Sequence, residues 1–170
     1  CPFCSRANRT LEELGRLYGA DLRLVFKHNP LPFHGDAIPA AEAALAAQDQ
    51  GRFWPMHDRL FGDTRALKRE DLERHAKELG LDLARFTAAL DSGAYRKVIA
   101  ADQAEAARLG AVGTPTFFIN GRKLAGAQPL ERFQALIDEE LQRAREQLKG
   151  VAPPPDVYAF LTREGADAAV

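Results

Sequence analysis

Cys1-Pro2-Phe3-Cys4 begins the sequence and contains the only two cysteines in a chain of 170 residues. Residues 5–18 place leucines at helical spacing and end at Gly19, which predicts a helix directly after the motif. A cysteine at a helix N-terminus lies beside free backbone N–H groups, and these stabilise a thiolate. We therefore interpret Cys1 as an activated nucleophile and Cys4, one turn further on, as a buried thiol that resolves a mixed disulfide.

Two structural explanations of the cysteine pair are weaker. A zinc site needs four ligands, and the sequence has no second Cys-x-x-Cys motif. The nearest histidines, His28 and His34, are separated by a proline-rich loop and fall outside the usual zinc-finger spacing. A structural disulfide that closes so short a loop removes little entropy from the unfolded chain. We therefore expect a redox-active pair, with no metal and no organic cofactor.

Composition and charge exclude several other classes of protein. Apolar residues make up 46% of the chain and charged residues 28%, which is typical of a folded globular domain. The 23 basic and 24 acidic residues give a formal net charge of −1, whereas a nucleic-acid surface needs a clustered basic excess. No stretch approaches the roughly 20 apolar residues of a membrane-spanning helix. We expect no nucleic-acid partner and no membrane span.

The rest of the chain predicts one strand, a long helical region, a hairpin and a final helix. The β-prone alternation of residues 22–26 predicts the strand. The hairpin is predicted by Asn120-Gly121, a strong turn signal between two short β-prone runs. The predicted elements, in order, are helix 5–18, strand 22–26, helical pieces 40–50, 54–61, 71–79, 82–90 and 95–109, hairpin 116–125, helix 129–148 and tail helix 156–161.

These motifs together carry a resemblance. The cysteine motif, the helical region and Val112-Gly113-Thr114-Pro115-Thr116-Phe117-Phe118-Ile119-Asn120-Gly121 resemble the DsbA-like family of thioredoxin-fold thiol–disulfide oxidoreductases. The similarity extends from Cys1 to about Leu148 and includes the Asn29-Pro30-Leu31-Pro32-Phe33-His34 loop. It implies an α/β thioredoxin-like fold with a large all-helical insertion. The predicted ranges are 1–37 and 111–149 for the core, 38–110 for the insertion, and 150–170 for a proline-rich linker and helical tail.

The resemblance also implies the site. In the family, the proline at the position of Pro115 is cis and faces the cysteine pair. The backbone of the preceding residue, here Thr114, pairs with an extended substrate. The candidate site residues are catalytic Cys1 and Cys4 and substrate-binding Pro2, Phe3, Thr114 and Pro115.

One departure from the family concerns the first strand. In the family fold a strand leads directly into the cysteine helix and lies between the strands that match residues 22–26 and 116–119. This strand is missing before Cys1. Three explanations are possible for the missing strand: residues lost from the sequence, a strand donated by a neighbouring molecule, or a strand formed by the β-competent segment 157–161. We expect the first.

Several side chains receive structural expectations. Trp54, Met56 and Phe61 are expected in the core of the insertion, because they lie at helical spacing. His57 and His75 lie among charged helix residues and are expected in solvent. Lys27 or His28, at the end of the predicted strand, is a candidate for assisting proton transfer, and His34 for a hydrogen-bonding role.

The leading hypothesis is a protein disulfide oxidoreductase or isomerase that exchanges disulfides with protein substrates and a redox partner protein. Because both cysteines belong to the redox pair and no others occur, we expect an oxidising, extracytoplasmic setting, namely the bacterial periplasm. A glutathione-linked glutaredoxin-like enzyme and a non-catalytic thioredoxin-fold interaction module of a longer protein are the alternatives. The direction of exchange, the substrate and the oligomeric state stay open.

Overall fold

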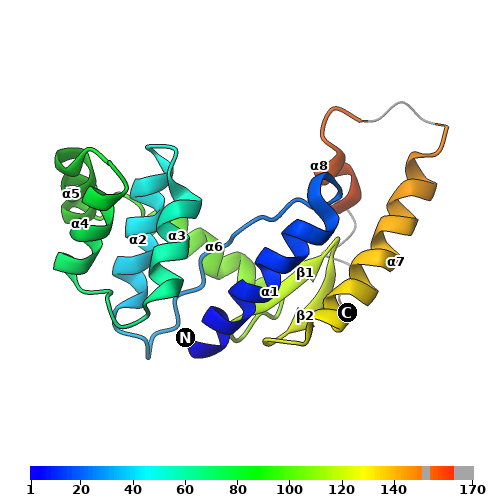
Figure 1. Ribbon diagram of the computed structural model, residues 1–170, viewed down its shortest axis with the longest axis horizontal. Helices are drawn as coiled ribbons and strands as arrows, with labels where there is room; N and C mark the ends of the chain where they lie inside the picture. The colour runs from blue at the N-terminus through cyan, green and yellow to red at the C-terminus, as the bar shows by residue number, and fades with distance from the viewer. Residues whose placement is uncertain (151–153, 163–170) are drawn as a thin grey trace. The chain divides into compact units, whose positions relative to one another are not determined.

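The computed structural model describes residues 1–150 and 154–162, so the predicted linker and tail lie partly outside the described residues. The described chain is mostly helical, with one small antiparallel sheet (Figure 1). In chain order the elements are α1 (Pro2–Tyr18), the short 3-10 helix η1 (Gly19–Asp21), α2 (Ala37–Gln48), α3 (Phe53–Gly62), α4 (Arg69–Glu78), α5 (Leu83–Ser92), α6 (Arg96–Arg108), β1 (Thr116–Ile119), β2 (Arg122–Ala125), α7 (Leu130–Leu148) and α8 (Val157–Thr162).

The chain forms two compact units, and the boundary between them falls inside α1. Cys1–Ser5 and Phe26–Val112 form the first, here called the helical unit. Arg6–Val25 and the residues from Gly113 onward form the second, the hairpin unit. The domain ranges predicted from the sequence differ from these units chiefly for residues 1–5 and 26–37, which were assigned to the core and here belong to the helical unit, and the ranges stay a prediction.

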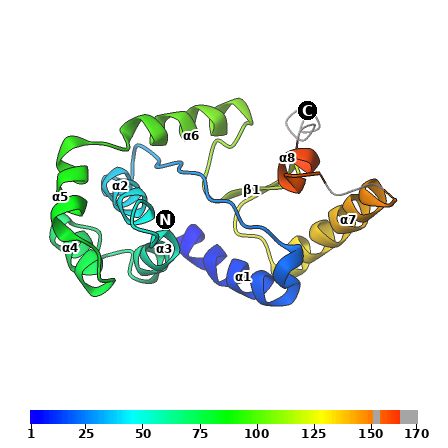
Figure 2. The same cartoon turned by 90° about the horizontal axis from the view of Figure 1, so that it is seen from above.

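The helical unit is organised around α2, which contacts α3, α4, α5 and α6 (Figure 2). Residues Ala41 to Ala47 of this helix are all buried, and all of them are apolar except Glu42, whose carboxylate lies 3.4 Å from the Arg96 guanidinium. The short alanine side chains leave room for larger ones from the surrounding helices. Those fully buried large side chains are Met56, Leu72 and Phe86.

The residues at the two ends of α5 explain where this helix begins and ends. The Asp82 carboxylate accepts a hydrogen bond from the Arg85 N–H at 3.1 Å and so caps the N-terminus. The helix ends at Gly93, whose φ of 61° lies in the left-handed region that favours glycine. Both ends of α5 are therefore specified by residues that lie next to them in the sequence.

The hairpin unit packs α1 and α7 against the two-stranded sheet. Asn120 and Gly121 have φ values of 46° and 92°, as the predicted tight turn requires. Phe117 pairs with Leu124 in the antiparallel register, and the Phe117 ring lies edge-on to that of Phe133 at 4.9 Å. The core of this unit centres on Leu14, Leu124, Phe133 and Ile137.

The predicted strand at residues 22–26 is not observed. Leu22 is extended, with φ −118° and ψ 123°, but the sheet of the described residues contains β1 and β2 alone. A strand is defined by a hydrogen-bonded partner as well as by extended backbone, and within residues 1–150 and 154–162 this segment pairs with none. Among these residues, no helix combines the length and apolar character needed to cross a membrane.

Candidate active site

The cysteine motif forms the first turn of a helix, as the sequence predicts. Cys1 directly precedes Pro2, the first residue of α1, and proline suits this position because its missing N–H has no partner to lose. The Ser5 N–H donates to the Cys1 carbonyl oxygen at 3.2 Å and closes the turn. Cys1 is therefore the residue beyond the helix end, where N–H groups and the helix dipole favour a negative charge.

The two cysteines do not differ in burial as expected. Both are half-buried, so the prediction of a buried Cys4 is wrong. Cys4 still belongs to the first turn of α1, near the end of the helix, and its neighbour Phe3 is 54% exposed. Access alone therefore does not distinguish the roles of the two thiols, and the difference must come from their positions relative to the helix N-terminus.

The Thr-Pro element lies in the hairpin unit, immediately before β1. The Thr114–Pro115 peptide bond is cis, as the resemblance implies. The Pro115 carbonyl accepts the Gly126 N–H at 2.8 Å, and the Thr116 hydroxyl donates to the Gly113 carbonyl at 2.7 Å. These bonds hold the turn into β1. The cysteines and Thr114–Pro115 thus belong to different units, and each has a defined local structure.

Six rings pack together in the helical unit and form what we call the ring cluster. His57 and Phe26 are central to it, with ring centroids 5.1 Å apart. His57 is 4% exposed and His28 is 6% exposed, whereas Trp54 is 40% exposed. The members of the ring cluster are Phe26, His28, Phe53, Trp54, His57 and Phe61.

Two expectations for this region are therefore wrong, those for His57 and Trp54. On α3 the buried residues are Met56, His57 and Leu60, which share one face of the helix. The expected core position of Met56 is confirmed, at 0% exposure. The spacing of Met56 and Leu60 was the signal that could have placed His57 inside.

Lys27 and His28 are held by α6. The Lys27 ammonium lies 3.2 Å from Asp102 and 2.9 Å from Glu105, and the hydrogen bond that it donates to Glu105 is the main cause that raises its pKa. The His28 N–H donates to Asp102 at 2.9 Å. Burial lowers the pKa of the His28 ring. Lys27 therefore stays charged and His28 stays neutral near pH 7, so Lys27 is a poor proton donor there.

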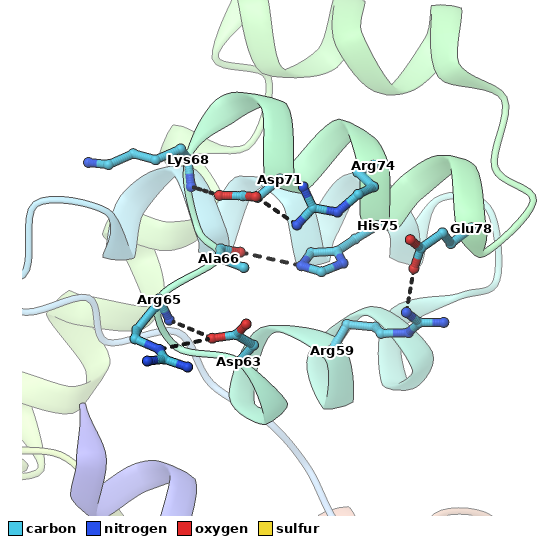
Figure 3. Close-up of polar contacts among 9 residues, drawn as sticks. All are labelled: Arg59, Asp63, Arg65, Ala66, Lys68, Asp71, Arg74, His75 and Glu78. Carbon is cyan, nitrogen blue, oxygen red and sulfur yellow. Dashed lines mark hydrogen bonds and ion pairs between the residues drawn. The ribbon is translucent and has the colours of Figure 1, made fainter.

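His75 is buried on α4, against the expectation that it is solvated (Figure 3). Its Nε2 lies 3.3 Å from the Ala66 carbonyl oxygen, and its Nδ1 is buried with no hydrogen-bond partner among the described residues. Its charged neighbours Asp71 and Arg74 are bound to each other at 2.6 Å (Figure 3). Leu72 and Ala76, both fully buried, mark the face that His75 shares.

A metal site requires a particular grouping of ligating side chains. Within residues 1–150 and 154–162, no three or more His, Cys, Asp or Glu side chains are grouped in a way that could hold a metal ion.

The fold and motifs agree with a known family. A family model described as a DSBA-like thioredoxin domain matches residues 1–138, and the chain belongs to this family. The family defines a class of thioredoxin-like oxidoreductases. The predicted fold class, a DsbA-like thioredoxin fold, is confirmed by this match and by the solved structures described next.

Two solved structures are similar over most of the chain. A thioredoxin-like oxidoreductase from Silicibacter pomeroyi DSS-3 is 30% identical with a TM-score of 0.74, covering 86% of this chain and 81% of that one. The oxidoreductase DsbA from Xylella fastidiosa is 26% identical with a TM-score of 0.68, with the same coverage of 86% and 81%.

The curated relatives are much longer proteins. The chain is 41% identical over 147 residues to the Na⁺/H⁺ antiporter NhaA of Herminiimonas arsenicoxydans, which covers 86% of this chain and 23% of that protein. It is 41% identical over 156 residues to the Na⁺/H⁺ antiporter NhaA 3 of Salinispora tropica, covering 91% and 24%. The chain therefore spans about a quarter of the length of these relatives.

Proposed function

We propose that the chain exchanges disulfides with protein substrates through Cys1 and Cys4. The observation that carries this proposal is the position of Cys1 immediately before the first residue of α1, with Cys4 in the same turn. Helix N–H groups favour the thiolate of Cys1, and the short spacing brings Cys4 within reach of a mixed disulfide on Cys1. Membership of an oxidoreductase family supports the same chemistry.

The proposed reaction has two exchange steps. The Cys1 thiolate attacks a substrate disulfide, forming a Cys1–substrate bond and releasing one substrate thiolate, which takes up a proton. Cys4 then loses its proton and attacks the Cys1 sulfur, forming the Cys1–Cys4 disulfide and releasing the second substrate thiol. The substrate gains two electrons from the chain and two protons, one given up by Cys4 and one taken from solvent. The reverse sequence oxidises a substrate dithiol.

The remaining candidate residues are proposed to bind substrate. Phe3 is 54% exposed and offers an apolar surface between the cysteines. The roles of Pro2, Thr114 and Pro115 rest on the family resemblance, with the Thr114 backbone pairing with an extended substrate. We further propose a redox partner protein that regenerates the pair and an extracytoplasmic location, because DsbA-like relatives act in oxidising compartments.

A second candidate function is that of a non-catalytic interaction module within a longer protein. The specific observation in its favour is that the relatives named as antiporters are about four times longer than the matched segment. Both cysteines are present in this chain, however, and a module that only binds has no need of a redox pair. We therefore favour the catalytic role.

Insulin reduction in the presence of dithiothreitol separates these candidates. The exchange proposal predicts that the wild-type chain accelerates the precipitation of insulin chains and that Cys1→Ser abolishes the acceleration. Asp63→Ala, which removes an exposed carboxylate of the same unit, serves as the matched control and should retain the activity. A wild-type rate equal to the background would favour the interaction module.

A further inference from the structure

The cysteine turn is tied to the end of α3 by one side chain. The Ser5 hydroxyl donates to the Phe61 carbonyl oxygen at 2.8 Å, in a partly buried position. Phe61 lies next to the last residue of α3, where helix carbonyls lack an N–H partner within their own helix. Figures 1 and 2 show the start of α1 beside the end of α3. Ser5 therefore satisfies a carbonyl that the helix itself leaves open.

Ser5 also closes the turn that holds both cysteines. Its N–H donates to the Cys1 carbonyl oxygen at 3.2 Å, which is the first hydrogen bond of α1. One residue thus makes two bonds, one within the Cys1–Ser5 turn and one from that turn to α3. The bond to α3 agrees with the grouping of Cys1–Ser5 with the helical unit, whereas α1 from Arg6 onward belongs to the hairpin unit.

The acceptor end of this contact is firmly held. The Phe61 ring lies 4.7 Å from the His57 ring and 6.4 Å from the Phe26 ring, measured between centroids. His57 is itself 4% exposed. Helix ends usually fray, but the Phe61 carbonyl belongs to a residue whose ring is packed in the ring cluster. The packed Phe61 ring therefore restrains the carbonyl to which the Cys1–Ser5 turn is bonded.

We propose that Ser5 is a positioning residue that holds the cysteine turn against α3 and thereby favours the reduced form of the Cys1–Cys4 pair. This inference rests on the proposed function, because it concerns the balance between thiolate and disulfide. In the reduced form the Cys1 thiolate depends on ordered N–H groups at the start of α1. Without the Ser5 hydroxyl bond, the turn frays and this stabilisation of the thiolate is lost. The disulfide form has no comparable negative charge to lose.

The test is the redox equilibrium of the full chain with glutathione. In that equilibrium two glutathione molecules reduce the Cys1–Cys4 disulfide and become one glutathione disulfide. We expect Ser5→Ala to lower the equilibrium constant for reduction by roughly two- to tenfold, the effect of losing one neutral hydrogen bond. Ser5→Thr, which keeps a hydroxyl, should restore the wild-type value. Ser5→Val, which has nearly the shape of threonine, should behave like Ser5→Ala.

Ser92→Ala is the matched control. The Ser92 hydroxyl donates to the Ala89 carbonyl at 3.1 Å within α5, so its removal also deletes a serine-to-helix bond of the helical unit. It should leave the glutathione equilibrium unchanged. An unchanged constant in both Ser5→Ala and Ser5→Val, or a constant shifted equally by Thr and Val, overturns the inference. Circular dichroism melting identifies any variant that fails to fold, and the Thr–Val comparison then decides.

Amide hydrogen exchange at Ser5 separates this inference from the proposed function. If the wild-type pair never equilibrates with glutathione, the proposed function fails. The contact itself is then judged by the Ser5 amide, which should exchange faster in Ser5→Ala than in wild type because the first turn opens more often. Equal exchange rates in the two proteins overturn the contact as a restraint on the turn.

Discussion

Cys1 and Cys4 are chemically distinguished by their places in one helical turn. Cys1 lies just outside α1 and Cys4 lies within its first turn, while both are half-buried. Because access is similar, any selectivity between the thiols has to come from the electrostatics of the helix N-terminus. This makes thiol selectivity a direct probe of the proposed roles.

We predict that a substoichiometric amount of iodoacetamide at neutral pH labels Cys1 in preference to Cys4. The thiolate is the reacting form, and the free N–H groups of the helix stabilise it most at Cys1. Peptide mass spectrometry of the native and the urea-unfolded chain provides the measurement, the unfolded chain being the control that removes the helix. Equal labelling of the two cysteines in the native chain would contradict the assignment.

His28 should make the stability of the chain depend on pH. Burial is the main cause that lowers its folded-state pKa below 6.5; the His57 ring lowers it further, and Asp102 partly opposes the shift. As the pH falls through 6.5, the unfolded chain binds a proton that the folded chain resists. The contribution of His28 is therefore fully present above that pH and is lost as the pH falls toward the folded-state pKa.

The measurement is urea unfolding between pH 7.5 and 5. We predict that the free energy of unfolding decreases over this interval in wild type and that His28→Phe, which preserves a buried ring, has a weaker dependence. His34→Phe is the control, because His34 lies outside the ring cluster and contacts Phe33. A His28→Phe profile parallel to that of wild type would show that the His28 ring is not the source of the dependence.

At the scale of secondary-structure elements, a side-chain cap marks where α5 begins. Asp82 caps α5 through the Arg85 N–H, and its own N–H and carbonyl bond the side chain of Gln50 at 2.8 and 3.3 Å. The carboxylate is the part of this arrangement that a substitution can remove without altering the backbone.

We therefore expect Asp82→Ala to lower the free energy of unfolding by about 1 kcal/mol, the usual cost of losing a helix N-cap. Asp82→Asn keeps a side-chain oxygen that can accept from Arg85 and should lose only a small part of this. Urea unfolding followed by circular dichroism measures both. If the two variants are equally unstable, the contribution of Asp82 is its charge and not the cap.

The elements that the sequence predicted well are those specified by neighbouring residues. Asn120-Gly121 specifies its own turn, and the hairpin follows. The predicted helices agree with α2 to α7 within a few residues. The strand prediction for residues 22–26 was wrong, because strand formation depends on a partner that is distant in the sequence. The prediction that His57 and His75 are solvent-exposed was wrong. It was based on their charged neighbours in the sequence, whereas their helical spacing relative to buried residues places them inside.

At the scale of the whole molecule, each unit has a hydrophobic core of its own. Phe133 is central to the core of the hairpin unit, at 2% exposure. We expect Phe133→Ala to destabilise the chain by about 3–5 kcal/mol, because it leaves a cavity among well-packed side chains. Hydrogen exchange should show lost protection in β1, β2 and α7. The exposed Leu17→Ala, at a position 55% exposed in wild type, should change stability little, and an equal effect would contradict this core.

The family can be predicted from the sequence because two specific motifs, separated by a helical region, occur in one chain. The cysteine pair and Thr114–Pro115 lie more than 100 residues apart, and the match to the family over residues 1–138 includes both. The contact between Ser5 and Phe61 could not be predicted in the same way. It depends on where α3 ends in space, which no pattern near Ser5 encodes.

The central claim is that Cys1 attacks substrate disulfides and Cys4 resolves the product, and covalent trapping tests it most directly. Reduced Cys4→Ala is mixed with insulin, the reaction is quenched with acid, and the products are analysed by non-reducing electrophoresis and mass spectrometry. We predict that a disulfide-linked adduct through Cys1 accumulates with Cys4→Ala, is short-lived with wild type, and is absent with Cys1→Ser. Accumulation in Cys1→Ser, or no adduct with Cys4→Ala, would contradict the proposed mechanism.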